Sequence, residues 1–105
     1  MLRIPLAIVT ALMTCILSYG NTWDTNKKVK QVELDASSDS LRVWIDNSPN
    51  TNYYYSYPTT GIYLDYSKSY LALFMTAIST GLAVDFYVPS PGTTGGKLSS
   101  AKIHQ

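Results

Sequence analysis

Cysteine and histidine are almost absent from this chain of 105 residues, which has one of each, Cys15 and His104. A single thiol excludes an internal disulfide. No group of Cys, His, Asp and Glu has the spacing of metal ligands, so we expect no metal and no cofactor. His104 lies close to the end of the sequence, and a lone histidine there is typical of a solvated side chain rather than a general base.

The chain also lacks a large excess of either charge, because it has eight Lys and Arg residues and seven Asp and Glu residues. This balance argues against nucleic acid as a partner, since nucleic acids require a basic surface. Asp65 and Asp85 would be neighbours on the outer face of adjacent strands, a pattern that ordinary surface acids share. Without a nucleophile paired to a base, we expect no catalytic residue and no enzymatic activity.

The beginning of the sequence carries the marks of an export signal. A short basic start precedes an apolar run over residues 4–17, and Ser18 and Gly20 supply small residues for a cut before Asn21. The run is shorter than the roughly 20 residues of a membrane span. The sequence therefore predicts a cleaved signal peptide, residues 1–20, and a secreted or periplasmic protein.

Two alternatives to this signal peptide stay open. One is a membrane anchor or a buried helix; the other is a lipoprotein, because residues 12–15 loosely resemble a bacterial lipobox that ends at Cys15. The remainder, residues 21–105, suffices for one small domain. An exported domain of this size without disulfides or metal usually needs a partner chain, so we expect a homo-oligomer.

Alternation of apolar and polar residues predicts short strands along this domain. The expected strands are residues 28–36, 41–46, 62–66, 82–88 and 98–104. A turn at Ser37–Asp39 would join the first two as a hairpin, and the phase error at Val29 indicates a β-bulge.

Residues 67–81 are expected to form the one helix, because apolar side chains recur there with a period of 3.6 residues. The face directed at the sheet would hold Tyr70, Leu73, Phe74, Ala77 and Ile78. Ser67 is a plausible N-cap, and Gly81 stands where a left-handed C-cap is wanted.

The opposite side of this helix is almost uncharged, whereas the exposed side of a monomer's helix normally carries charge. We therefore expect an oligomer interface there, and a helix with a mild solvent-exposed surface is the alternative. The interface residues would be Ala72, Met75, Thr76 and Ser79.

Five strands with one helix between the third and the fourth follow the order of an OB-fold, a small Greek-key barrel that binds oligosaccharides or oligonucleotides. The predicted fold class is therefore all-β with one helix, a five-stranded OB-fold barrel over residues 21–105.

Tyrosine is the most abundant aromatic residue, and four tyrosines fall within residues 53–57. Successive side chains of a strand point to opposite faces, so some of these rings must be exposed. Exposed rings are suited to stacking on sugars or to protein interfaces, although aromatic residues also simply favour strands. We expect a glycan-binding region formed by Trp23, Asp24, Asn50, Asn52, Tyr54 and Tyr55.

The residues from Tyr70 to Val88, with the glycine-rich loop and the closing Ala101-Lys102-Ile103, resemble the pentameric B subunit of subtilase cytotoxin and related small exported bacterial proteins. The resemblance implies a ring of five subunits with helices at its centre and glycan sites on the outer barrel. It leaves a companion toxin subunit as an open alternative, because this chain alone does not indicate one. It does not extend to the family's disulfide-forming cysteines, which this chain lacks beyond residue 20. It also does not extend to the family's sialic acid site, because the position of that site's serine falls near Asn26 or Lys27, neither of which is a serine.

Together these observations predict a secreted, non-enzymatic OB-fold protein that resembles a toxin B subunit and binds cell-surface glycans as an oligomer, with a pentamer suggested by the resemblance. The alternative is an exported structural or protein-interaction module without a glycan ligand, such as an inhibitor or an envelope component.

Overall fold

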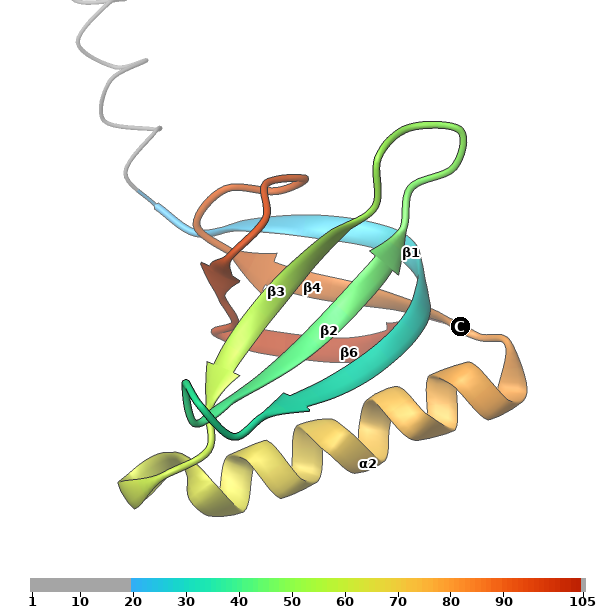
Figure 1. Ribbon diagram of the computed structural model, residues 1–105. Coiled ribbons are helices and arrows are strands. Elements are labelled where there is room, and N and C mark those ends of the chain that lie inside the picture. Colours follow the sequence, from blue (N-terminus) through green and yellow to red (C-terminus); the bar gives the residue numbers. More distant parts are fainter. Residues whose placement is uncertain (1–19, 105) are drawn as a thin grey trace, which may run out of the picture.

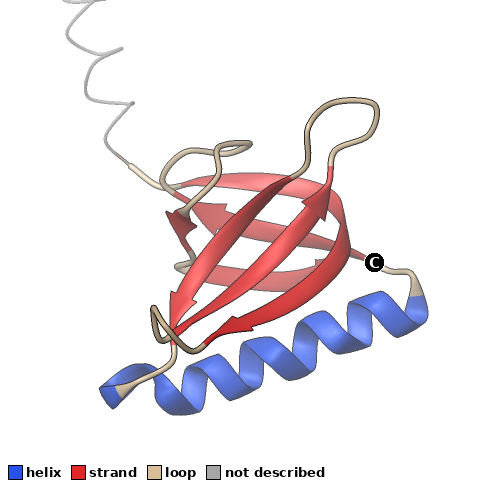
Figure 2. Cartoon of the chain, in the orientation of Figure 1, coloured by secondary structure: helices blue, strands red, loops and turns tan. Residues whose placement is uncertain are grey.

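The computed structural model describes residues 20–104, which form one curled sheet and one long helix (Figures 1 and 2). The predicted signal peptide lies outside the described residues, except for Gly20. The elements are β1 (Thr22–Asp35), β2 (Ser40–Asp46), β3 (Tyr53–Pro58), η1 (Gly61–Tyr63), α2 (Leu64–Thr80), β4 (Ala83–Val88), β5 (Gly96–Lys97) and β6 (Ser100–His104). Within this part of the chain, no helix is long and apolar enough to cross a membrane.

The six strands form one sheet in the order β5-β3-β2-β1-β4-β6. β1 is long enough to pair with β2 through its second half and with β4 through its first half, so the sheet curls around it (Figure 1). The two edge strands, β5 and β6, are consecutive in the chain. The two residues between them continue the hydrogen bonding to the neighbouring strands. Leu98 N–H donates to Ser56 O of β3, and Ser99 N–H donates to Tyr87 O of β4, both at 2.9 Å.

The prediction of a mostly β chain with one helix and a curled, barrel-like sheet is confirmed, whereas the sheet has six strands rather than the predicted five and the third predicted strand is wrong. Residues 62–66 belong to η1 and the first turn of α2, and the third strand is the tyrosine-rich β3. In β3 the rings of Tyr53, Tyr55 and Tyr57 point inward, while Tyr54 points outward. Burial of three large rings on one face makes this segment the strand.

The predicted hairpin of the first two strands is confirmed, with the β-bulge between Val29 and Gln31. The first strand nevertheless begins earlier than predicted. Residues 22–27, expected to be a polar lead-in, are the part of β1 that pairs with β4. A second irregularity interrupts this pairing, where Asn26 has a φ of 59° and its N–H donates to Asp85 Oδ1 at 2.7 Å.

The helix starts three residues before the predicted N-cap and ends as predicted. Ser67 is buried inside α2, where its hydroxyl donates to Leu64 O at 2.6 Å, and the N-cap position is Tyr63. Gly81 has a φ of 72°, the left-handed conformation that glycine adopts without a Cβ penalty, and its N–H donates to Ala77 O.

The core lies between the inner face of the curled sheet and α2, which crosses one end of the sheet (Figure 2). Phe74 of α2 lies 5.8 Å from the ring of Phe86, and that ring lies 5.4 Å from Tyr55. These three side chains are fully buried. Of the predicted inward helix face, Phe74 and Ala77 are buried, Tyr70 and Leu73 are partly buried, and Ile78 is 38% exposed at the edge.

Candidate functional site

The outer face of β1, β2 and β3 carries a row of side chains from three neighbouring strands. Gln31 pairs with Trp44, and Trp44 pairs with Tyr54. The Trp44 and Tyr54 rings lie 4.8 Å apart and are tilted by 51°. The Arg42 guanidinium lies 5.1 Å from the Tyr54 ring centre and is held by Asp35 at 2.9 Å. These contacts fix two aromatic rings on the outside of the sheet.

The bulge in β1 forms a hollow beside this aromatic pair. Because Val29 pairs with Ile45 and Gln31 pairs with Trp44, Lys30 is the extra residue of β1. Bulges re-aim side chains, and here the result is a hollow of about 180 Å³ lined by Lys30, Gln31, Trp44 and Asn52. We call these four residues the bulge hollow.

The polar groups of the residues that line the bulge hollow are one ammonium, two side-chain amides and one indole N–H. The Trp44 indole N–H is enclosed and has no acceptor among residues 20–104. The side-chain oxygen of Asn52 accepts the Asn47 N–H at 2.9 Å, and its NH₂ group is a donor. Lys30 has no ion-pair partner within 4 Å in the same part of the chain.

Two residues expected to bind glycans lie instead inside the sheet, and that expectation is corrected for them. Asp24 is 8% exposed, and its Oδ2 accepts the hydroxyl hydrogens of Tyr53 at 2.7 Å and Tyr55 at 2.6 Å. The Tyr55 ring is fully buried, and its oxygen also accepts the Gly92 N–H at 2.8 Å. Neither side chain offers a surface to a sugar, because both are buried. Asp24 joins β1 to β3, and Tyr55 joins β3 to the loop before β5.

This buried network also raises the pKa of both tyrosines. Burial contributes most, because it disfavours the phenolate, and the hydrogen bond to the Asp24 carboxylate adds to it. The two hydroxyls therefore stay protonated over the physiological pH range. Through them, β3 is hydrogen-bonded to Asp24 of β1.

The remaining predicted glycan residues are divided between three places. Asn52 and Tyr54 lie at or beside the bulge hollow. Trp23 lies in another part of the surface, 4.9 Å from the Tyr87 ring, with the Lys102 ammonium 4.6 Å from its ring centre. Asn50 is exposed in the loop between β2 and β3, where its N–H donates to Asn47 O. The structure therefore does not bring Trp23 to Tyr54.

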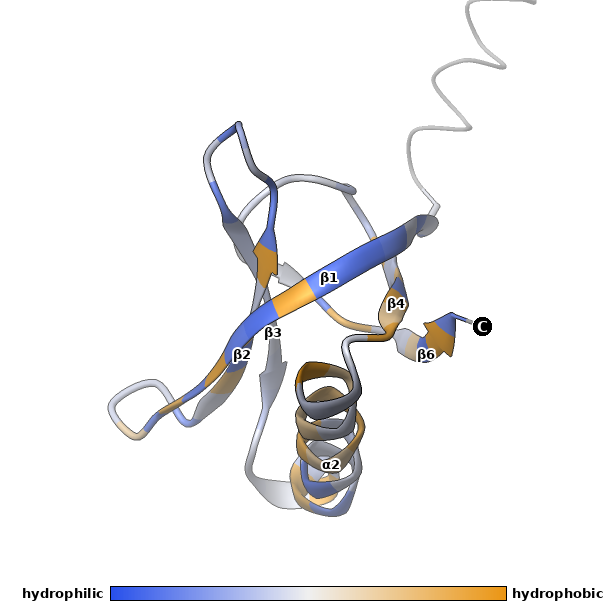
Figure 3. Ribbon diagram, turned by 90° about the vertical axis from the view of Figure 1, so that its right-hand side faces the viewer, coloured by the Kyte–Doolittle hydropathy of each residue, from blue (hydrophilic) through white to orange (hydrophobic). Residues whose placement is uncertain are grey.

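The predicted interface residues of α2 are all exposed. Ala72, Met75, Thr76 and Ser79 lie on the side of the helix turned away from the sheet, with Met75 53% exposed. Apolar colour is not confined to the side of α2 that faces the sheet (Figure 3). Along one flank of α2, Leu64, Met75 and Ile78 are exposed as well.

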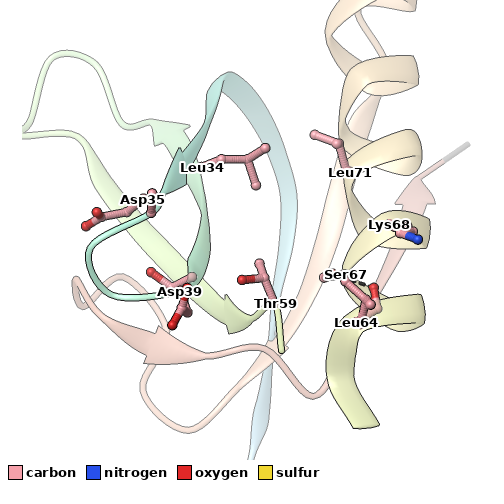
Figure 4. Close-up of a pocket in the computed structure, with 10 residues that line it drawn as sticks. Leu34, Asp35, Asp39, Thr59, Leu64, Ser67, Lys68 and Leu71 are labelled. Carbon is pink, nitrogen blue, oxygen red and sulfur yellow. Dashed lines mark hydrogen bonds between the residues drawn. The ribbon is translucent and has the colours of Figure 1, made fainter. Parts of the chain in front are cut away.

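A groove of about 290 Å³ continues this apolar flank toward the β1–β2 hairpin. Leu34 of β1 and Leu71 of α2 point toward one another across it, while Asp35 and Asp39 lie on the hairpin side and Lys68 lies on the helix side (Figure 4). Leu34 is 63% exposed. The groove is therefore an apolar depression with charged residues at its rim.

His104 was expected to be a solvated side chain, and the structure gives it a partner. Its Nδ1 lies 3.2 Å from Oδ2 of the buried Asp85. Burial by itself would raise the pKa of the Asp85 carboxyl, but the N–H of Asn26 together with His104 and Lys102 lowers it. This carboxylate joins the end of β6 to the irregular part of β1.

Sequence reasoning missed three of the four residues of the bulge hollow. Trp44 was placed correctly on the polar face of the second strand, and the phase error at Val29 indicated a bulge. These two signals together could have suggested a bulge beside an outward-facing indole. The sequence does not give the register between β1 and β2, however, and this register is what places Lys30 and Gln31 beside Trp44.

No protein-family model matches this chain, and no curated protein has a significantly similar sequence. The function therefore rests on the chemistry of the surface described above.

Proposed function

We propose that this protein is an exported, non-enzymatic carbohydrate-binding protein that acts as a homo-oligomer. The observation that carries the proposal is the outward-facing Trp44–Tyr54 pair beside a small polar hollow. Sugars have apolar C–H faces rimmed by hydroxyl groups. A binding site for them combines aromatic rings with amide and charged groups, and Gln31, Asn52 and Lys30 supply these groups here.

The small size of the site implies weak binding by each copy. One aromatic contact contributes about 0.5–1.5 kcal/mol beyond the area it buries. Several copies held on one assembly would raise the overall affinity through effective concentration. Carbohydrate binding and oligomerisation are therefore parts of the same proposal.

The strand pairings support an OB-fold as the finer description of the sheet. β3 pairs with β5 and β4 pairs with β6, and both hydrogen bonds of the Leu98–Ser99 link continue these pairings. If β5 and β6 count as one interrupted strand, the order becomes that of a closed five-stranded barrel. OB-folds bind oligosaccharides on the face of their second and third strands, where Trp44 and Tyr54 lie.

The outer face of α2 supports the oligomer. Four neighbouring positions without charge, of which Ala72 and Met75 are apolar, lie beside exposed Leu64 and Ile78, and an uncharged surface with exposed apolar side chains supports a protein interface there. The resemblance to the toxin B subunit favours a ring of five and an export signal, and it leaves a companion toxin subunit open. These three features remain proposals.

The apolar groove favours a second candidate function, an exported protein-interaction module. Leu34, Leu64 and Leu71 line a depression large enough for an apolar side chain of a partner protein. In this case the partner would bind at the hairpin and the helix, and the bulge hollow would have no role. The two candidates therefore predict effects from different substitutions.

A glycan array distinguishes these two functions. We expect the wild-type oligomer to give signals that Trp44→Ala abolishes or weakens at least tenfold, while Trp23→Ala and Leu34→Ala leave them within about twofold. The two tryptophan variants are matched, because each removes an indole from the outer surface. An array without signals at high protein concentration would contradict carbohydrate binding and favour the interaction module.

A further inference from the structure

We propose that α2 pairs with α2 of a second copy of this chain, antiparallel and related by a two-fold axis, so that each helix fills the apolar groove of the other copy. This inference rests on the homo-oligomer of the proposed function and names the contact that forms it. It differs from the ring of five, because a two-fold contact closes with two copies. It follows from a second stripe of side chains along α2 and from the position of the apolar groove on that stripe.

The second stripe lies beside the face of α2 that packs against the sheet. The sheet side holds Ser67, Tyr70, Phe74 and Ala77. A neighbouring set recurs at alternating spacings of four and three residues and is exposed, apart from the partly buried Leu71. We call this set the α2 stripe, and its members are Leu64, Lys68, Leu71, Met75 and Ile78. This alternation is the spacing at which two helices pack along a common line of contact.

The two halves of the α2 stripe have different surfaces. In the first half, Leu64, Lys68 and Leu71 form the helix wall of the apolar groove of about 290 Å³, and Leu34 lies on the opposite wall (Figure 4). In the second half, Met75 and Ile78 are exposed and do not line the groove. One face of the molecule therefore carries both a depression and free apolar side chains of a size that suits it.

An antiparallel pair brings the second half of one helix to the groove of the other copy. In the register that sets Leu71 opposite Met75 of the second copy, Lys68 lies opposite Ile78 of that copy. This Ile78 enters the groove between Leu64 and Leu71, as a knob enters a hole in paired helices. The two-fold axis repeats the contact at the other end of the pair. The α2 stripe is thus complementary to itself, which is what an interface between two identical copies requires.

The charges of α2 favour the antiparallel direction. Asp65 and Lys68 are its only charged residues, and both lie in its first half. A parallel pair would bring the two Lys68 ammonium groups together, and like charges repel. In the antiparallel pair Asp65 comes to the end of the other helix, where the Lys28 ammonium donates to Gly81 O. Neither Asp65 nor Lys28 has an ion-pair partner within 4 Å among residues 20–104.

Sedimentation equilibrium of the exported protein tests this contact. At micromolar concentration we expect a mass of two chains. Ile78→Glu should raise the dissociation constant of the dimer about a hundredfold or more, because the two-fold axis places the new charge in both grooves. Ile78→Ala, which adds no charge, should raise it about tenfold. Ser69→Glu is the matched control, since it puts the same charge on an exposed position of α2 outside the α2 stripe, and it should change the constant less than threefold.

Disulfide cross-linking tests the direction of the two helices. Residues 21–105 contain no cysteine, so an introduced cysteine has no competitor there. Under mild oxidation a mixture of Leu71→Cys and Met75→Cys proteins should form a cross-linked pair. Leu64→Cys alone should not, because its two copies lie at opposite ends of an antiparallel pair. Far-UV circular dichroism shows that each variant is folded.

The possible failures are distinguishable. A wild-type mass of five chains, efficient cross-linking of Leu64→Cys with itself, or equal dissociation constants for Ile78→Glu and Ser69→Glu would overturn the helix pair and leave a homo-oligomer. A wild-type monomer at micromolar concentration would overturn the homo-oligomer of the proposed function as well. Carbohydrate binding is tested separately by the glycan array.

Discussion

The buried hydroxyl of Tyr55 gives the sharpest prediction about what holds the strands together. Tyr55→Phe keeps the ring in the core and removes only the oxygen, which donates to Asp24 at 2.6 Å and accepts the Gly92 N–H at 2.8 Å. Tyr53→Phe removes a single bond, to the same carboxylate oxygen at 2.7 Å. Tyr57→Phe is the control, because its ring points inward from the same strand and its hydroxyl has no hydrogen-bond partner among residues 20–104.

The magnitudes follow from the number of bonds lost. A hydrogen bond to a charged group contributes about 1.5–3 kcal/mol to the free energy of unfolding, and a neutral one contributes about 0.5–1.5 kcal/mol. We therefore expect Tyr55→Phe to lower the free energy of unfolding by about 2–4.5 kcal/mol and Tyr53→Phe by about 1.5–3 kcal/mol. Tyr57→Phe should change it by less than about 0.5 kcal/mol.

Urea unfolding at neutral pH, followed by circular dichroism at one protein concentration, measures these differences. With a slope of about 1–3 kcal/mol/M for a small protein, the Tyr55→Phe midpoint should fall by on the order of 1 M. Limited proteolysis should also show faster cleavage of residues 89–95 in this variant, because Gly92 loses its anchor. A midpoint for Tyr55→Phe equal to that of Tyr57→Phe would refute the proposed role of the buried network.

Three further predictions concern alkaline stability, assembly and export. Burial raises the pKa of Tyr53, Tyr55 and Tyr70 above the unfolded value of about 10, so their contribution to stability is complete below pH 10 and is lost as the pH rises further; a urea midpoint equal at pH 8 and pH 11 would contradict this. Ala72→Glu with Thr76→Lys should turn the oligomer into a folded monomer by light scattering, whereas Thr94→Glu in an exposed loop should not, and a wild-type monomer at micromolar concentration would exclude the oligomer. Mass spectrometry of the secreted protein should find a chain that starts at or near Asn21, and an intact Met1 or a diacylglyceryl group on Cys15 would contradict the cleaved signal peptide.

The first hairpin could be predicted from the sequence because its two strands alternate clearly between apolar and polar residues. The third strand could not, since Ile62 and Tyr66 fit either a strand at i and i+4 or a helix at the same spacing. In β3 the alternation is hidden, because inward and outward positions are both tyrosine. Pairing with β2 determines which face of β3 points inward, since Tyr55 lies opposite the buried Val43.

The candidate site was predictable only in part, for a similar reason. Alternation places Tyr54 opposite to Tyr53 and Tyr55, but it does not tell which face is the inner one. Asp24 was misplaced because a carboxylate in a polar stretch normally lies at the surface. It is buried here because two tyrosine hydroxyls, from residues 29 and 31 positions further along the chain, satisfy its oxygen.

Nuclear magnetic resonance of the two indole N–H groups tests carbohydrate binding at the outer face of β2 and β3 most directly. The ¹⁵N-labelled protein shows one resonance for Trp23 and one for Trp44, assigned by the two single Trp→Phe variants. On addition of the saccharide with the strongest array signal, we predict that the Trp44 resonance shifts and the Trp23 resonance does not. A shift confined to Trp23, or no shift of either resonance at saturating saccharide, would contradict binding at this site.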